Sequence, residues 1–183
     1  MGLDLTPEHI TLAKEKYSTQ CEKLDYMVGS VTSLPEEIKK GPKFTHVFTT
    51  QVICHMARFQ RDVLREAHSV LDTNGILVID DFVQSESGVS HHAENYFFKR
   101  LHFEPLMTFA DYAQSLTQAG FDIVSFENAT DSMGYGYEII APLAAKADCV
   151  EYDGQPLSKH YEETSKCCYR GEIGMVVIVA RKQ

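Results

Sequence analysis

Short apolar runs separated by longer amphipathic segments give this chain the pattern of an α/β protein. Runs rich in β-branched and aromatic residues predict strands. They lie at residues 24–31, 44–53, 76–83, 121–126 and 174–181. From Phe59 to Leu71 the apolar residues fall on a single helical stripe, which predicts a helix with one buried face. Asn74 and Gly75 are expected to end it in the left-handed conformation that these residues tolerate.

The first residues predict a strand end followed by a helix. Residues 1–5 form a strand fragment, and a helix is expected from Pro7 to about Ser18. Thr6 suits the cap position, Pro7 the first helical position and Glu8 the positive end of the helix dipole.

Strand, helix and strand at this spacing predict a parallel sheet wrapped by helices. The run at 76–83 is apolar enough to be covered on both faces. The regular alternation of strands and helices ends after Gln84. Cap segments are expected at about 84–107 and 132–172, within a single domain over residues 1–183. Between the two segments, Thr108 and Asp111 resemble a capping box, and Gly120 stops the helix that it opens.

Charge and composition narrow the function classes. The net charge of −9 at pH 7 argues against a nucleic-acid partner, because binding to the phosphate backbone needs clustered positive charge. The longest strongly apolar run has six residues, which is too short for a bilayer span. The five cysteines contain no C-x-x-C pair, which argues against a disulfide framework or a zinc site and favours a reducing cytosol.

Polar residues follow three of the predicted strands, at the edge where open α/β sheets bind ligands. Asp4 suits a ribose diol, and an equally good interpretation is a cap for the following helix. Ser30 and Val31 suit the rim of an adenine ring, although an ordinary turn is favoured by position alone. Thr49, Thr50 and Gln51 offer oxygen atoms to a ligand amine.

Four stretches carry a resemblance to a known family. GLDLTPEHI, MVGSVTSLP, FTHVFTTQVICHM and VLREAHSVLDTNGILVIDDF resemble the class I S-adenosylmethionine-dependent methyltransferases, and more narrowly the small-molecule branch with the sarcosine/dimethylglycine enzymes. The resemblance implies a Rossmann-like α/β sheet, mostly parallel with an antiparallel last strand, and helical cap insertions. It also implies S-adenosylmethionine as the cofactor, a small-molecule methyl acceptor and no metal.

The resemblance assigns roles by position. Asp4 would bind the cofactor ribose, and Ser30 and Val31 would flank the adenine, although the family often has aspartate where Ser30 stands. Gln51 and Val52 would line the methionine end.

On the acceptor side, Tyr96, His102 and Tyr137 would bind substrate. His55 is the first candidate for a base, and a surface or helix-end histidine is the alternative interpretation. Aromatic faces stabilise methylated ammonium groups. The cap aromatics that offer such faces are Tyr96, Phe97, Phe98, Tyr135, Tyr137 and Tyr161.

Two further patterns leave alternatives open. Phe97 and Phe98 are equally consistent with the core of an amphipathic helix. Asp80 and Asp81 at a strand end point to opposite faces. One of them could pair with a cationic substrate while the other is solvated or caps a loop.

The family's glycine-rich cofactor loop and its central first strand have no counterpart in these residues. An amino-terminally truncated product is therefore expected, or a sheet that pairs its two inner edges directly or borrows a strand. Unpaired buried backbone groups cost about 1–3 kcal/mol each. Residues 1–5 and 44–53 should be parallel strands, with the groove between them open or irregularly paired.

These observations predict methyl transfer to a small-molecule acceptor, most simply an amine such as a glycine derivative. The alternatives are a non-catalytic remnant or partner subunit, and a nucleotide-cofactor oxidoreductase that shares the ribose role of Asp4. A cytoplasmic protein that forms a homo-oligomer fits the same pattern.

Overall fold

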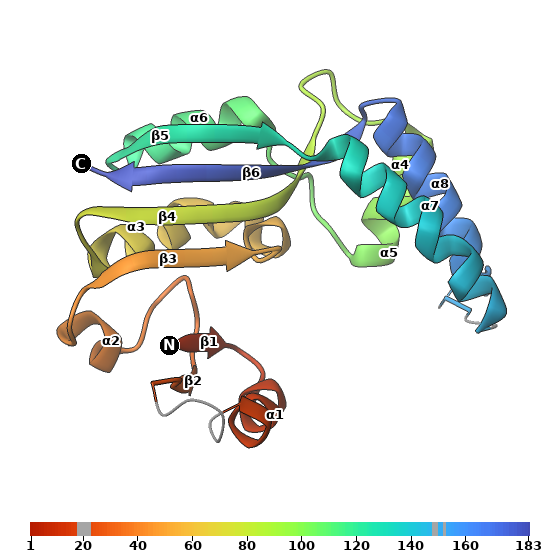
Figure 1. Cartoon of the computed structure of the whole chain (residues 1–183). Helices are drawn as coiled ribbons and strands as arrows, with labels where there is room; N and C mark the ends of the chain where they lie inside the picture. Colours follow the sequence, from red (N-terminus) through yellow and green to blue (C-terminus); the bar gives the residue numbers. More distant parts are fainter. Residues whose placement is uncertain (18–22, 148–149, 152) are drawn as a thin grey trace.

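The computed structural model describes residues 1–17, 23–147, 150–151 and 153–183, and in it the strands form two separate sheets. A small parallel sheet pairs β1 with β2, and a larger sheet has the order β3-β4-β6-β5 (Figure 1). The strands are β1 (Gly2–Asp4), β2 (Tyr26–Val28), β3 (Phe44–Thr50), β4 (Leu71–Gln84), β5 (Phe121–Asn128) and β6 (Ile173–Lys182).

The helices fall into three groups: α1 with the small sheet, α2 to α3 and α6 with the larger sheet, and the rest in a cap at one end (Figure 1). They are α1 (Pro7–Tyr17), α2 (Glu36–Lys40), the 3₁₀-helix η1 (Ile53–Phe59), α3 (Gln60–Val70), α4 (His91–Ala93), the π-helix η2 (Glu94–Phe98), α5 (Lys99–Leu101), α6 (Phe109–Gln118), α7 (Thr130–Lys146) and α8 (Leu157–Tyr169). The expected end of α1 near Ser18 lies outside the described residues.

Strand directions follow the pattern expected from the sequence. β3 pairs with β4 in parallel, and β6 runs antiparallel to both β4 and β5. Parallel pairing of β3 with β4 depends on the crossover through η1 and α3, as parallel pairs require. The Rossmann-like α/β fold with an antiparallel last strand is therefore confirmed.

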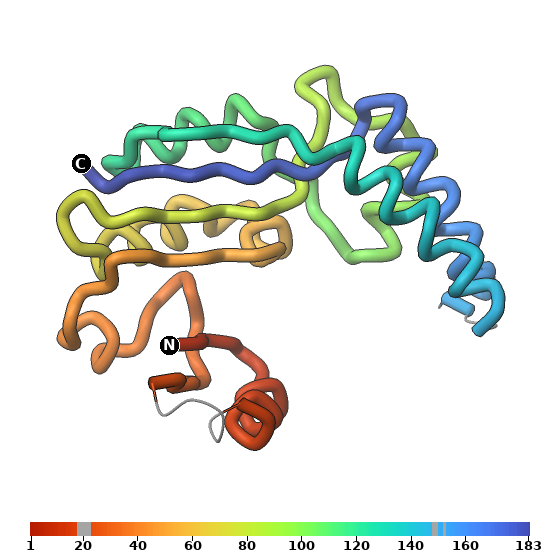
Figure 2. Tube along the Cα trace, viewed as in Figure 1, coloured from red at the N-terminus to blue at the C-terminus, as the bar shows by residue number. Residues whose placement is uncertain are grey.

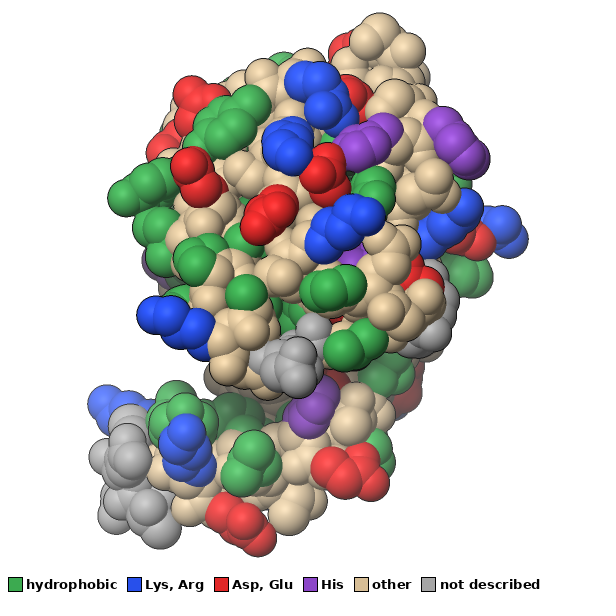
Figure 3. Space-filling view, turned by 90° about the vertical axis from the view of Figure 1, so that its right-hand side faces the viewer, with side chains coloured by type: hydrophobic (Ala, Val, Ile, Leu, Met, Phe, Trp, Pro, Cys, Tyr) green, Lys and Arg blue, Asp and Glu red, His purple; other side chains and the backbone are tan. Residues whose placement is uncertain are grey.

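The two sheets do not pair with each other. β1 and β3 are the strands that face across the gap. The chain trace shows β1, α1 and β2, which we call the α1 unit, set apart from the larger sheet (Figure 2). From the cap end the α1 unit forms a distinct lobe, and the surface is hollowed between it and the rest of the molecule (Figure 3). The expectation that residues 1–5 and 44–53 hold parallel strands with an open groove between them is confirmed.

Only one face of the larger sheet is covered by helices in the described part of the chain. On β6, Val176, Ile178 and Ala180 are buried, whereas the alternate Val177 and Val179 are half-exposed. α3 and α6 both lie on the buried face (Figure 1). The expectation that the 76–83 run is covered on both faces is therefore wrong for the first part of the run in the described residues, where Ile76, Val78 and Asp80 are half-exposed because α3 and α6 pack on the same side.

Two hydrophobic clusters hold the molecule together. The first lies between the larger sheet and helices α3 and α6 and includes Leu64, Leu77 and Tyr112. The second, which we call the cap cluster, joins the end of β4 to the cap helices through Phe82, Phe97, Phe98, Leu106, Cys167 and Cys168. The cap is thereby packed onto the carboxyl end of the central strands.

Local turn chemistry agrees with the sequence at one helix and differs at another. Thr108 and Asp111 form a reciprocal capping box at the start of α6, as predicted, and Gly120 follows that helix with φ of +85°. Asn74 has φ of 62°, but it lies inside a bulged β4 instead of ending a helix, because α3 already stops at Val70.

Gly174 is the glycine that most clearly cannot carry a side chain. A Cβ atom there would lie 2.1 Å from Thr130 Oγ1 and 3.1 Å from its Cβ. We expect Gly174→Ala to lower the free energy of unfolding by about 1–3 kcal/mol through overpacking. Urea unfolding checks this, and adding Thr130→Ala should recover part of the loss. An unchanged midpoint for Gly174→Ala would contradict the packing of α7 on β6.

Candidate functional site

The carboxyl ends of β1, β3 and β4 lie at the same end of the molecule, toward the cap (Figure 1). Asp4 ends β1, Gln51 follows β3, and Ser30 follows β2, which is parallel to β1. The strands thus bring the three polar residues singled out from the sequence to one edge, as the carboxyl ends of parallel strands must.

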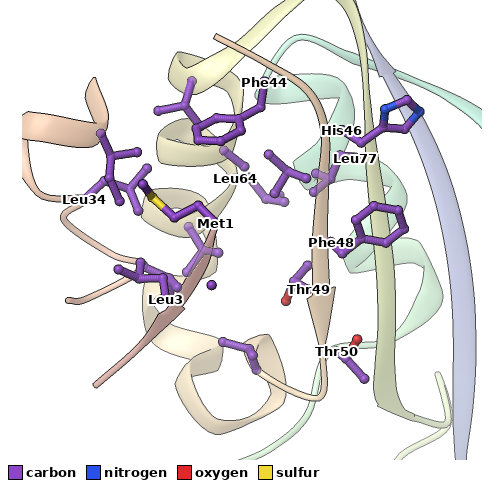
Figure 4. Close-up of a pocket in the computed structure, with 18 of the residues that line it drawn as sticks. Met1, Leu3, Leu34, Phe44, His46, Phe48, Thr49, Thr50, Leu64 and Leu77 are labelled. Atoms are coloured by element: carbon purple, nitrogen blue, oxygen red, sulfur yellow. The ribbon is translucent and has the colours of Figure 1, made fainter. Parts of the chain in front are cut away.

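A cavity of about 590 Å³ lies between the two sheets, and we call it the inter-sheet cavity. Leu3 reaches into it from β1, Thr49 from β3 and Leu64 from α3 (Figure 4), and Thr50 also lines it. The lining is mostly apolar, and it includes Val31 and Val52 at the end where the strands stop. Neighbours of all three strand-end residues therefore share one cavity.

Asp4 is engaged by the helix that follows it. Its Oδ1 accepts a hydrogen bond from the Thr6 backbone N–H at 2.8 Å, and its Oδ2 lies 3.4 Å from His9 Nδ1. The Thr6 N–H lowers the pKa of the Asp4 carboxyl. Asp4 thus forms a turn with Thr6 directly before α1, and the capping interpretation stays a prediction. Each carboxylate oxygen keeps a second lone pair for another donor, so the ribose role stays a prediction.

Ser30 closes a tight turn. Its Oγ lies 2.8 Å from Thr32 Oγ1 and accepts from the Thr32 N–H at 3.2 Å. Val31 packs against the first hydrophobic cluster and lines the inter-sheet cavity. The turn interpretation of Ser30 is thus observed, while its place beside the cavity leaves the adenine role as a prediction.

Gln51 has a backbone conformation that fixes the end of β3. Its φ is 51°, in the left-handed region, and its N–H donates to the Asp80 carbonyl at 2.7 Å. Its side chain is exposed, and Nε2 lies 4.0 Å from Met175 Sδ. Val52 follows and lines the cavity. Thr49 Oγ1 is buried without a hydrogen-bond partner in the described part of the chain.

His55 lies in η1, directly after the β3 strand end. Its N–H donates to the Val52 carbonyl at 3.2 Å, and its ring lies 4.8 Å from the Phe103 ring. The imidazole is exposed. Its role as a base stays a prediction.

The three predicted acceptor-binding residues lie in the cap and do not line the inter-sheet cavity. Tyr96 packs its ring 5.4 Å from His160 of α8 and 4.7 Å from His92. His102 ends α5 with φ of 54° and is exposed. Tyr137 contacts Arg100. All three lie in the cap and not at the inter-sheet cavity, and their roles in binding an acceptor stay predictions.

The aromatic faces expected to bind a substrate cation already hold a cation of this chain. The Arg100 guanidinium carbon lies 5.8 Å from the Tyr137 ring centre and 5.2 Å from that of Tyr161, and Nη2 donates to Tyr137 Oη at 3.3 Å. Burial raises the pKa of Tyr137. Phe97 and Phe98 are buried in the cap cluster, which confirms the core interpretation for both.

A buried polar cluster anchors the carboxyl end of β4. Asp81 accepts from Tyr112 Oη at 2.9 Å, from the Cys54 N–H at 3.0 Å and from the Phe82 N–H at 2.9 Å. Burial raises the pKa values of Asp81, Tyr112 and Cys54.

Asp80 and Asp81 do point to opposite faces, since Asp81 is buried and Asp80 half-exposed. Asp81 is completely buried and accepts from the backbone N–H of Cys54 after β3, and pairing of either aspartate with a cationic substrate stays a prediction. Sequence reasoning missed Cys54 as a partner of Asp81 and Arg100 as the cation between the tyrosines.

In the described part of the chain, no helix combines the length and apolarity that a bilayer span requires. Among the same residues, no three His, Cys, Asp or Glu side chains are grouped so that they could hold a metal ion.

Comparison with known protein families identifies one domain match. Residues 1–79 match the family model of the methyltransferase domain, Methyltransf_11. A search of curated protein sequences finds no match.

Solved structures agree on the fold. A protein assigned as a sarcosine dimethylglycine methyltransferase from Galdieria sulphuraria superposes with a TM-score of 0.82 at 15% identity, over 99% of this chain and 68% of that one. The geranyl diphosphate C-methyltransferase of Streptomyces coelicolor, in complex with S-adenosyl-L-homocysteine, gives 0.76 at 13% identity, over 100% and 62%. Phosphoethanolamine N-methyltransferase 2 of Haemonchus contortus gives 0.79 at 17% identity, over 99% and 43%.

The chain therefore has the fold of the class I S-adenosylmethionine-dependent methyltransferases, and a methyltransferase domain is recognised over residues 1–79. This confirms the resemblance seen in the sequence. The chain spans about two thirds or less of the length of the structures compared.

Proposed function

We propose that this chain binds S-adenosylmethionine at the shared strand edge and serves methyl transfer to a small-molecule acceptor. The observation that carries the proposal is the placement of Asp4, Ser30 and Gln51 at the carboxyl ends of parallel strands beside one cavity. The match of residues 1–79 to the methyltransferase domain supports it.

The residues present fit an adenosyl group. The Asp4 carboxylate is partly exposed and has lone pairs to spare for two ribose hydroxyls. Val31 and Val52 give the end of the cavity an apolar surface suited to a flat ring. Gln51 would hold the methionine end with its amide. When bound, the cofactor supplies an electrophilic methyl group.

We propose an amine as the acceptor, such as a glycine derivative. An amine with its usual pKa is protonated at neutral pH and must lose a proton before it can attack. His55 is exposed at the same edge and would accept that proton. Tyr96, His102 and Tyr137 would then act from the cap, with Arg100 and Tyr137 holding the cap helices in place.

The Asp4 role has a direct test. Asp4→Asn keeps an oxygen for the Thr6 N–H but removes the charge and one acceptor. Because a hydrogen bond to a charged group contributes about 1.5–3 kcal/mol, the affinity for S-adenosylhomocysteine should fall roughly tenfold to a hundredfold. Calorimetric titration measures this.

Asp25→Asn is the matched control, since Asp25 is also exposed and accepts from the following backbone N–H at 2.8 Å. It should leave the affinity unchanged. Equal losses in the two variants would contradict the ribose role.

The gap between the sheets favours a second candidate, a non-catalytic remnant or partner subunit. The absence of heat with millimolar S-adenosylhomocysteine would support that candidate over cofactor binding.

We also propose a reducing, cytosolic location. Cys54, Cys167 and Cys168 are free thiols in the structure, and burial raises the pKa of Cys167 to about 11 and of Cys168 to about 12. Cell fractionation tests the location. Homo-oligomerisation is a further proposal, and light scattering tests it.

A further inference from the structure

A second cavity lies between α3 and α6, two helices on the same side of the larger sheet (Figure 1). Its volume is about 310 Å³, and we call it the α3–α6 cavity. Polar side chains form most of its lining: Arg61, Arg65 and His68 from α3, and Ser115, Gln118 and Ala119 from the end of α6. None of these residues lines the inter-sheet cavity, so the α3–α6 cavity is separate from the edge at which the cofactor is proposed to bind.

The α3 side of this cavity carries two guanidinium groups. Arg61, Arg65 and His68 follow one another at intervals of four and three residues, which places them on one face of the helix. In the part of the chain that the structure describes, Arg61 forms no ion pair. Arg65 Nη2 lies 2.8 Å from Asp62 Oδ1 on the same helix. Because a guanidinium has five N–H donors, both arginines keep donors for a ligand in the cavity.

The surrounding charges keep this cavity positive. Glu66 of the same helix is already paired with Lys39 at 3.0 Å. Lys182 donates to the carbonyls of His68 and Leu71 at 2.8 Å each, which brings a further cation close to the cavity. Burial and Lys182 lower the pKa of His68, so near neutral pH its imidazole is uncharged and still donates one N–H. The carboxyl end of α6 adds about half a negative charge, which the two guanidinium groups outweigh.

A buried amide next to this cavity lacks a hydrogen-bond partner. Gln60 is only 7% exposed, and its Oε1 accepts from Ser115 Oγ at 3.1 Å. Its Nε2 has no partner among the described residues. If the amide turned over, Nε2 would donate to Ser115 Oγ, and the Ser115 hydroxyl would be free to donate to an acceptor in the cavity. A ligand with acceptor oxygens would therefore give this pair one more hydrogen bond.

We propose that the α3–α6 cavity binds the phosphate group of a small phosphate ester, held by the guanidinium groups of Arg61 and Arg65. A guanidinium pairs with phosphate oxygens through two parallel N–H bonds. Two such groups match the charge of close to −2 that a phosphate monoester carries at neutral pH. The volume of about 310 Å³ lies at the lower limit of small-ligand pockets, which span about 300–1,000 Å³. This binding site goes beyond methyl transfer.

Inorganic phosphate is the first probe, and it replaces chloride at constant ionic strength in a titration of the whole chain. Nuclear magnetic resonance of the arginine Nε–H groups should show saturable shifts at Arg61 and Arg65. Arg58, which pairs with Glu104 at 2.7 Å and does not line the cavity, should show none. Glycerol phosphate is the second probe. A higher affinity than that of inorganic phosphate would assign a phosphate ester, whereas equal affinities would assign recognition of the phosphate group alone.

Single substitutions locate the binding site. Arg61→Gln and Arg65→Gln each remove one guanidinium and should weaken phosphate binding by roughly tenfold to a hundredfold, because hydrogen bonds between charged groups are lost. Lys14→Gln is the matched control, since it removes one positive charge at an exposed position of α1. It should leave the affinity for phosphate unchanged. Ser115→Ala removes the hydroxyl and should weaken binding severalfold.

Equal affinities of Arg61→Gln, Arg65→Gln and Lys14→Gln would overturn the proposal, because they would show a general attraction of anions to the surface. So would shifts that do not saturate, or acetate binding as tightly as phosphate. Circular dichroism establishes that each variant is folded, and Arg61→Lys replaces Arg61→Gln if it is not. Titration with S-adenosylhomocysteine is a separate readout, and Arg61→Gln should leave it unchanged because Arg61 does not line the inter-sheet cavity.

Discussion

Replacement of Asp81 by alanine is expected to lower the free energy of unfolding by about 3–5 kcal/mol. Tyr112 Oη and the N–H groups of Cys54 and Phe82 would all lose their acceptor inside the core. Each buried donor that loses its acceptor costs about 1–3 kcal/mol. The small cavity left by the missing carboxylate offsets little of this cost. Urea unfolding followed by circular dichroism measures the loss.

Asp72→Ala is the matched control for this change. Asp72 lies on the same strand, but its side chain is exposed, so the free energy of unfolding should stay within about 0.5 kcal/mol of the parent value. If Asp81→Ala unfolds at the same urea concentration as Asp72→Ala, the buried cluster does not hold β4 to α6.

The same aspartate gives the chain a pH dependence. Burial raises the pKa of Asp81 above its ordinary value of 3.8. The folded protein therefore holds this proton more tightly than the unfolded chain. The resulting stability is fully present below about pH 3.8 and is lost as the pH rises through the folded-state pKa. Asp81→Asn should abolish this part of the decline, which unfolding at a series of pH values checks.

The fold could be predicted from local patterns. The five predicted apolar runs correspond to β2 to β6, and the predicted capping box at Thr108 is present. The open face of β4 could not be predicted, because an apolar run says that a strand can be buried but not which neighbours are available to cover it. The two-part sheet followed only from comparing the chain with a family pattern.

The site was predicted as positions and not as contacts. The spacing placed Asp4, Ser30 and Gln51 at strand ends, where the structure has them. Their present partners depend on the local turn, and Asp4 accepts from the Thr6 N–H directly before α1. The burial of Asp81 was beyond reach because its partner Tyr112 comes from a helix 31 residues further along the chain.

The cap shows how a correct residue type can serve a different purpose. Tyr137 and Tyr161 were expected to present aromatic faces to a cation, and they do so to Arg100. An arginine that follows the buried Phe97 and Phe98 in a helix falls within reach of α7 and α8 only once the cap has folded. The residue pattern along the sequence does not say how close this helix lies to α7 and α8.

Phe97 is the residue on which the cap cluster depends most, and Phe97→Ala is expected to lower the free energy of unfolding by about 3–5 kcal/mol. Its ring is completely buried and lies between 5.4 and 5.6 Å from the rings of Phe82, Phe98 and Phe103. Phe82 belongs to β4, so this ring connects the cap to the sheet. Urea unfolding measures the loss.

Tyr135→Ala is the control, because this cap aromatic is 59% exposed and its loss should change the free energy of unfolding by less than about 0.5 kcal/mol. Tetramethylammonium serves as the probe for the rival interpretation, in which Phe97 forms part of an aromatic cage. A Phe97→Ala variant of unchanged stability that binds this cation more weakly would favour the cage. Loss of stability, with hydrogen exchange accelerated first in η2 and α8, would place Phe97 in the core, because those helices pack on the sheet through its ring.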